Sequence, residues 1–128
     1  MTEPYWFERA ECLALHNFLI AQYGGMAGIR DENLLESALS KPRNLFAYEQ
    51  PTMADVAASY ADGVVKNHPF LDGNKRTGFI LAAAFLERSG YRFSASEAEV
   101  VVQTLGLAAG EVSEAEYGAW LHANSRKP

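Results

Sequence analysis

The stretch NHPFLDGNKRTGF, residues 67–79, decides how this sequence is interpreted. Pro69 and Gly73 mark a tight turn, and the apolar run that follows is typical of a buried helix. Lys75 and Arg76 therefore stand in the first turn of that helix. A helix N-terminus carries partial positive charge and favours carboxylates over cations. Each misplaced cation costs up to ~1 kcal/mol without compensation, which indicates that an anion binds there.

Length and composition indicate one globular domain covering residues 1–128. No apolar run is long enough to span a bilayer, and the N-terminus lacks the basic and apolar regions of a signal peptide. Cys12 is the single cysteine, so no intrachain disulfide can form, as is usual in a reducing compartment. We therefore expect a cytoplasmic protein without membrane contact. The net charge of −5 disfavours nucleic acid, although a local basic site could still hold a small phosphate ligand.

Hydrophobic periodicity predicts an all-α chain of about six helices with very little strand. The helices at 53–67 and 74–89 are the most apolar, so we expect them to form a central pair that holds the intervening loop rigidly. The other expected helices cover 7–23, 32–39 and two segments that start at the capping-box patterns of Ser96 and Ser113. A short extended segment is expected at 91–93.

Local signals also predict where the second and third helices begin and end. Asp31 and Thr52 are the expected N-caps, because their side-chain oxygens can accept the free N–H groups of a first helical turn. Pro42 is expected to end the second helix, since the residue before a proline avoids the helical conformation. Residues 43–52 are then predicted to form a loop or a short hairpin.

Three kinds of chemical group gather within the opening stretch. The free N–H groups of the 73–77 turn and the helix dipole form an anion site, beside which Lys75 and Arg76 add cations. Asp72 is a hard oxygen ligand suited to Mg²⁺, which commonly uses one or two carboxylates together with substrate phosphates. His68 supplies a base, because histidine titrates near neutral pH. The combination predicts a site of phosphoryl or nucleotidyl transfer.

Each of these residues also has an ordinary structural explanation. His68 could be a helix-end histidine that gains from the C-terminal dipole, and Asp72 could cap the following helix. Lys75 and Arg76 could be solvated charges or could pair with Asp72. Phe70 is expected to be a core residue that fixes the loop. All of these independent explanations would have to be true at once within one short turn. The sequence therefore favours a catalytic phosphate site.

The nine residues HPFLDGNKR, at 68–76, resemble the signature of the Fic/Doc family, H-x-F-x-[D/E/N]-[A/G]-N-x-R. The Doc (death-on-curing) branch is the most similar, because it has Lys at the position where Fic adenylyltransferases have a second Gly. Sequence segments at 22–25, 28–31, 34–39 and 44–48 also resemble the Doc branch and extend the resemblance over roughly residues 13–92. The resemblance implies an all-α, single-domain Fic fold.

The resemblance implies a role for each residue of the loop. His68 resembles the catalytic base that deprotonates a target hydroxyl, and Asp72 resembles the carboxylate that binds Mg²⁺. The residues that resemble the phosphate cradle for ATP are Gly73, Asn74, Lys75 and Arg76, of which Lys75 and Arg76 also join His68 in the catalytic set. A Lys in place of Gly narrows the space for the α- and β-phosphates. This implies reversed ATP binding, with the γ-phosphate facing the hydroxyl, and a protein Ser/Thr kinase.

The Doc branch further implies a toxin that phosphorylates elongation factor Tu and arrests translation. Its cognate antitoxin is expected to place a C-terminal segment in a groove beside the active site. Many Fic enzymes carry an inhibitory motif, [S/T]-x-x-x-E-[G/N], which this sequence lacks, so a separate inhibitor is expected. Residues 43–52 correspond to the family's flap, which pairs with the main chain of the target. Two alternatives stay open, an AMP transferase and a Fic-like module that binds a nucleotide or a partner without turnover.

Four residues outside the loop receive ordinary interpretations. Cys12 and His16 are four residues apart in a predicted helix and could form a metal or thiolate pair. Two ligands make a poor metal site, so Cys12 is interpreted as a small apolar residue and His16 as a surface residue. His122 is also expected at the surface. Arg30 is interpreted as part of a helix start, with a contact to the nucleotide as the less favoured alternative.

Overall fold

The computed structural model describes residues 3–128, which contain six α-helices and one two-stranded antiparallel sheet. In chain order the elements are α1 (Arg9–Tyr23), α2 (Glu32–Tyr48), α3 (Met53–Asn67), α4 (Asn74–Arg88), β1 (Arg92–Phe93), α5 (Glu97–Ala109), α6 (Glu114–Ala123) and β2 (Ser125–Arg126). The prediction of an all-α fold is confirmed. Among the helices described, none combines the length and the apolar character needed to cross a bilayer.

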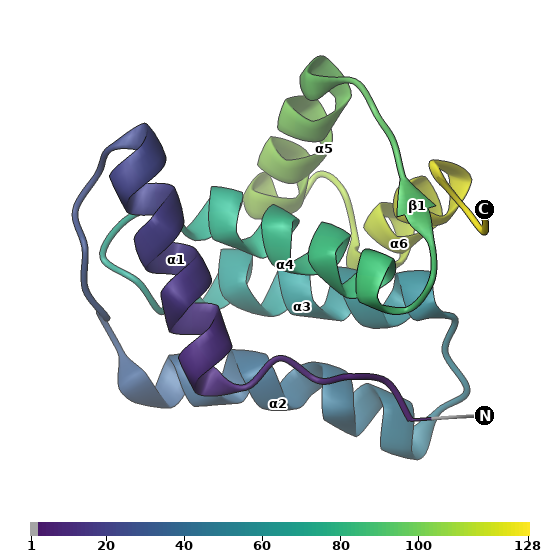
Figure 1. Cartoon of the computed structure of the whole chain (residues 1–128), viewed down its shortest axis with the longest axis horizontal. Coiled ribbons are helices and arrows are strands. Elements are labelled where there is room, and N and C mark those ends of the chain that lie inside the picture. Colours follow the sequence, from purple (N-terminus) through teal and green to yellow (C-terminus); the bar gives the residue numbers. More distant parts are fainter. Residues whose placement is uncertain (1–2) are drawn as a thin grey trace.

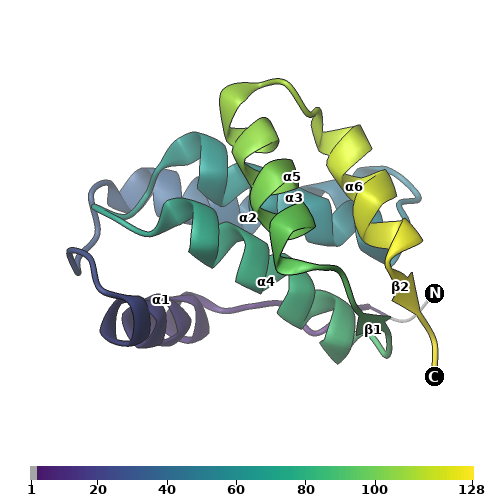
Figure 2. The same cartoon turned by 90° about the horizontal axis from the view of Figure 1, so that it is seen from above.

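Helix α3 is the centre of the fold, and it packs against α2, α4 and α6. Ten of its fifteen residues are buried, which explains why its sequence is rich in Ala and Val. Figure 1 shows α2 on one side of the α3–α4 pair, α5 and α6 on the other, and α1 crossing the pair. The predicted central pair is therefore present. The α3–α4 loop (residues 68–73) and the α1–α2 loop (residues 24–31) lie together at one end of the molecule (Figures 1 and 2).

The predicted helix starts agree with the structure. Asp31, Thr52, Ser96 and Ser113 each accept a hydrogen bond from the N–H three residues further along the chain. Thr52 and Ser113 complete a reciprocal capping box, whereas Ser96 acts as a simple N-cap. These caps satisfy N–H groups that a first helical turn leaves without partners.

The second helix is longer than predicted. Helix α2 continues to Tyr48, so the expected stop at Pro42 and the predicted loop or hairpin are wrong over residues 43–48. Pro42 is buried within the helix, as is Ala38, which contacts α3. A proline removes one intrahelical hydrogen bond, and the burial of this face against α3 outweighs that local cost. The flap interpretation loses its extended segment for the same reason.

The absence of a side chain at Gly78 lets the central helices approach closely. A Cβ atom at Gly78 of α4 would lie 2.9 Å from Cγ2 of Val65 and 3.1 Å from the carbonyl oxygen of Ala61, both on α3. Protein interiors are close-packed, so contacts this short leave no room for an added methyl group. The spacing of the pair that carries the α3–α4 loop therefore depends on Gly78.

Replacing Gly78 by Ala is expected to destabilise the protein by about 1–3 kcal/mol through overpacking at the α3–α4 crossing. This loss exceeds the gain of up to ~1 kcal/mol that Ala brings in helix propensity. Urea denaturation followed by circular dichroism measures the difference. An unchanged or raised free energy of unfolding in Gly78→Ala would show that the helices do not depend on this close contact.

Candidate active site

The α1–α2 loop forms a wall behind the α3–α4 loop. The N–H of Leu71 donates to the carbonyl of Gly28 at 3.0 Å. The N–H of Arg30 donates to the carbonyl of Pro69 at 2.7 Å, and an antiparallel bridge joins the two segments between these bonds. The sequence did not predict this wall, because the pairing joins segments about 40 residues apart and has no local signature.

Phe70 and Asn74 close the α3–α4 loop on itself. The Asn74 side-chain oxygen accepts the N–H of Phe70 at 3.0 Å, and its Nδ2 donates to the Phe70 carbonyl at 3.0 Å. Both residues are buried, so these hydrogen bonds are shielded from competing water. Phe70 is the core residue that the sequence predicted. Because the side-chain amide of Asn74 already forms these two hydrogen bonds, its main-chain N–H is the group that can bind an anion.

His68 stands directly after α3 and presents its ring to solvent. Its N–H donates to the carbonyl of Val64, and its backbone is left-handed, with φ 50° and ψ 57°. No other non-glycine residue among 3–128 has a positive φ. Such a conformation costs on the order of 1 kcal/mol, so its surroundings must hold it. The ring Nδ1 lies 3.5 Å from Nδ2 of Asn74, at the limit of hydrogen-bond distance.

Asp72 is held by main-chain donors from both loops. Its Oδ1 accepts the N–H of Gly73 at 2.9 Å, and its Oδ2 accepts the N–H of Met26 at 3.1 Å. A Cβ atom at Gly25 would lie 2.8 Å from Oδ2, and Gly25 has a φ of 119°, so glycine is required there. No group of three or more acidic, His or Cys side chains in residues 3–128 could bind a metal. The exposed Asp72 fits Mg²⁺ that takes its other ligands from phosphates and water.

The first turn of α4 carries cations where carboxylates would be expected. Gly73 is its N-cap, no acidic residue lies in the turn, and the N–H groups of 74–76 have no intrahelical acceptors. Lys75 and Arg76 are exposed and form no ion pair with any residue of the described chain, so a pair with Asp72 is not formed. The Arg76 guanidinium instead lies 4.5 Å from the ring centre of Tyr23. The turn therefore has the charge and the open donors of an anion site.

Two hollows open beside these cations, and Lys75 lines both. The first, of about 620 Å³, is bounded by His68, Lys75 and one face of α5. The second, of about 440 Å³, extends from Lys75 and Arg76 along α1, α4 and α5. His68, the two cations and an apolar surface therefore lie next to one another. Val101, Val102 and Leu105 of α5 expose half or more of their surface there.

Comparison with known proteins agrees with this geometry. The Fic/DOC family matches residues 6–86. The chain belongs to the Fic/DOC family. It is 36% identical over 104 residues to "Protein kinase doc" of Escherichia phage P1, which covers 80% of this chain and 82% of that protein. It is 35% identical over 77 residues to "Toxin Doc" of Mycolicibacterium smegmatis, which covers 57% of this chain and 58% of that protein.

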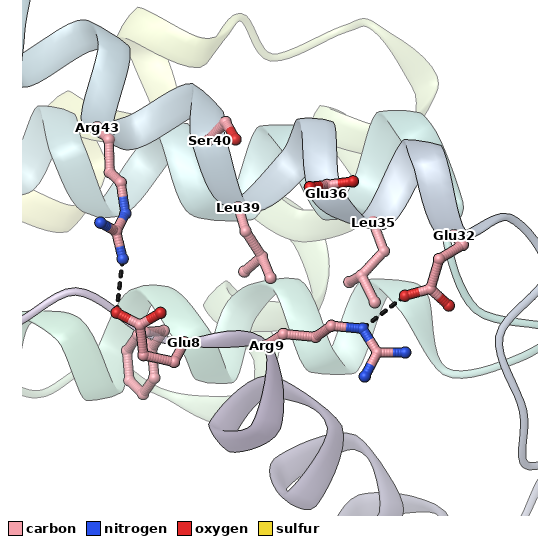
Figure 3. Close-up of a pocket in the computed structure, with 9 residues that line it drawn as sticks. Glu8, Arg9, Glu32, Leu35, Glu36, Leu39, Ser40 and Arg43 are labelled. Atoms are coloured by element: carbon pink, nitrogen blue, oxygen red, sulfur yellow. Dashed lines mark hydrogen bonds and ion pairs between the residues drawn. The ribbon is translucent and has the colours of Figure 1, made fainter.

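This Fic/DOC chain has another cleft, of about 540 Å³, between the start of α1 and α2 (Figure 3). Its arginines are already paired, Arg9 with Glu32 at 2.5 Å and Arg43 with Glu8 at 2.7 Å. The hydrogen bond from Arg9 lowers the pKa of Glu32 below its usual range. Because neighbouring carboxylates neutralise both arginines, this cleft does not offer the anion site that the first turn of α4 offers.

The prediction that His16 is a surface residue is wrong. His16 is buried, its Nε2 donates to the Asp72 carbonyl at 2.8 Å, and its ring stacks on Phe70 with centroids 3.8 Å apart. It therefore anchors the α3–α4 loop of this Fic/DOC domain to α1. The sequence does carry a signal for this burial, since His16 shares the inner helical face of α1 with Cys12 and Leu19.

Cys12 is a buried apolar residue, as the sequence predicted. Burial raises the pKa of its thiol to about 11, so the thiol stays neutral at physiological pH. A metal site formed by Cys12 and His16 is therefore unfavourable, because a ligating cysteine must lose its proton. His122 is exposed on α6, as predicted.

Two substitutions at His16 separate its hydrogen bond from its stacking. His16→Phe keeps a ring against Phe70 but leaves the Asp72 carbonyl without a donor, which is expected to cost about 1–3 kcal/mol of stability. His16→Gln keeps a donor at similar reach and is expected to lose less. Denaturant unfolding of both variants at pH 7 measures this. A larger loss in His16→Gln than in His16→Phe would show that stacking, rather than the hydrogen bond, anchors the loop.

Proposed function

We propose that this Fic/DOC protein is the toxin of a toxin–antitoxin pair and transfers the γ-phosphate of ATP to a Ser or Thr hydroxyl of a protein. The proposal rests mainly on two cations, Lys75 and Arg76, which have no carboxylate partner among residues 3–128. They lie in the open first turn of α4, beside the exposed His68. The similarity to a protein named a protein kinase supports it. Elongation factor Tu is the target expected from the resemblance, and arrest of translation is the expected consequence.

The described residues can divide the reaction among them. His68 takes the proton of the target hydroxyl while the hydroxyl oxygen attacks the γ-phosphorus; the bond to the β–γ bridging oxygen breaks, and ADP leaves. The N–H groups of 74–76, with Lys75 and Arg76, face the phosphate charge. Asp72 would hold Mg²⁺, which neutralises phosphate charge when bound. The exposure of His68 leaves room for a macromolecular substrate.

An AMP transferase would use the same residues differently. The target hydroxyl would attack the α-phosphorus, and pyrophosphate would leave. The resemblance to the Doc branch favours the kinase, because it implies that a Lys at position 75 narrows the space that a Gly would leave for the α- and β-phosphates. A module that binds a nucleotide or a partner without turnover would need neither the exposed base nor Asp72. The net charge of −5 gives no support to a nucleic acid substrate.

ATP labelled at either the α or the γ position distinguishes these functions. We expect label to move to elongation factor Tu, or to a protein of a cell lysate, from the γ position only. Transfer from the α position only would contradict the kinase and favour AMP transfer. His68→Ala is expected to lower the rate by at least about 10²-fold, because the hydroxyl loses its base. Full activity in that variant would reject the catalytic role of His68.

The antitoxin part of the proposal rests on the 440 Å³ hollow along α1, α4 and α5. Val101 and Leu105 line it and are each 50% exposed, and Lys75 and Arg76 stand at its border. Clustered apolar residues at a surface are typical of a protein interaction site. An apolar antitoxin segment in this hollow would lie against both cations and obstruct the phosphates. This placement agrees with the absence of an inhibitory motif in the sequence.

Leu105→Asp is expected to weaken antitoxin binding by about 10-fold or more, since it places a charge in an apolar contact. Calorimetric titration with a peptide of the antitoxin C-terminus measures the affinity. Tyr48→Asp is the matched control, because Tyr48 is 86% exposed at the end of α2 and does not line the hollow. Equal affinities of the wild-type protein and Leu105→Asp would place the antitoxin elsewhere.

A further inference from the structure

The main chain of His68 receives support from Arg30 of the α1–α2 loop, which the proposed reaction does not use. The carbonyl groups that end α3 lack intrahelical partners, and His68 itself adopts a left-handed backbone. Nε of Arg30 donates to the His68 carbonyl at 2.6 Å. Nη2 of Arg30 donates to the Asn67 carbonyl at 2.9 Å. One guanidinium therefore binds two consecutive carbonyls at the point where the chain leaves the helix.

Main-chain donors reinforce this contact. The N–H groups of Arg30 and Asp31 both donate to the carbonyl of Pro69, at 2.7 Å and 3.1 Å. The carbonyls of residues 67–69 thus all accept hydrogen bonds from Arg30 and its neighbour. Asp31 is itself fixed as the N-cap of α2, so these donors come from a well-anchored segment.

The Arg30 guanidinium has no carboxylate partner among residues 3–128. Its charge is favourable at the C-terminal end of α3, and a lysine would share that benefit. Its planar fork, however, fits two adjacent carbonyl groups in a way that a single ammonium group does not. The contact therefore fixes the orientation of the His68 peptide group as well as compensating charge.

We infer that Arg30 is a positioning residue for His68, an inference that rests on the proposed transfer reaction. By binding the carbonyls of Asn67 and His68, it holds the left-handed conformation in which the His68 ring lies near Asn74 and borders a hollow with Lys75. In this role Arg30 acts through the main chain of His68 and not on the reacting atoms.

Three variants test this role by steady-state kinetics. Arg30→Met removes the donors and keeps the apolar stem, while Arg30→Lys keeps the charge alone. In Arg30→Met we expect kcat to fall about 10- to 100-fold, because a displaced base loses its alignment with the hydroxyl. KM for ATP should stay within about twofold, and Arg30→Lys should behave much like Arg30→Met. Arg9→Met is the matched control and should keep full activity, since Arg9 is an exposed arginine that binds the Glu32 side chain and not the carbonyls of Asn67 and His68.

Histidine ring resonances in NMR spectra give a second readout that does not require turnover. In Arg30→Met the His68 resonances should shift or broaden, while those of His122 on α6 should stay unchanged. If the wild-type protein transfers no phosphate, the proposed function fails, and these resonances still decide the role of Arg30. An unchanged His68 spectrum would overturn the inference, as would full activity in Arg30→Lys or a rise in KM that accounts for the whole loss.

Discussion

The two hydrogen bonds between the Asn74 side chain and the main chain of Phe70 set the shape of the α3–α4 loop. They bring the C-terminal end of α3 close to the N-terminal end of α4. The first end carries His68, and the second carries Lys75 and Arg76 in a turn with free N–H groups. His68 and the open first turn of α4 therefore lie side by side because one buried side-chain amide closes the turn between the two helices.

Contacts from outside the α3–α4 loop hold Asp72 and His68 in place. His16 on α1 binds the Asp72 carbonyl and stacks on Phe70, and Met26 of the α1–α2 loop binds the Asp72 carboxylate. Arg30 binds the carbonyl of His68. These contacts fix the loop before a substrate binds. Polar groups that are already in position need little reorganisation during a reaction, and this preorganisation is the main source of electrostatic catalysis. The packed α3–α4 helix pair supports this arrangement.

Local sequence signals predicted the parts of the fold and site that depend on neighbouring residues. The caps at Asp31 and Thr52 and the cations of α4 follow from such short-range chemistry. Pro42 was predicted incorrectly, because burial of α2 against α3 overrides its local effect. The helical face that His16 shares with Cys12 and Leu19 indicates its burial. The hydrogen bonds of His16 and Arg30 could not be predicted from the sequence, since their partners lie 56 and 38 residues away. Those distant contacts complete the site.

In the proposed function, the first turn of α4 binds the phosphates of ATP with the γ-phosphate directed toward His68. A crystal structure with Mg²⁺ and a non-hydrolysable ATP analogue tests it most directly. We predict phosphate oxygens on the N–H groups of 74–76 and on Arg76, the metal on Asp72, and the γ-phosphate beside the His68 ring. An α-phosphate beside His68, or a nucleotide bound away from α4, would contradict it.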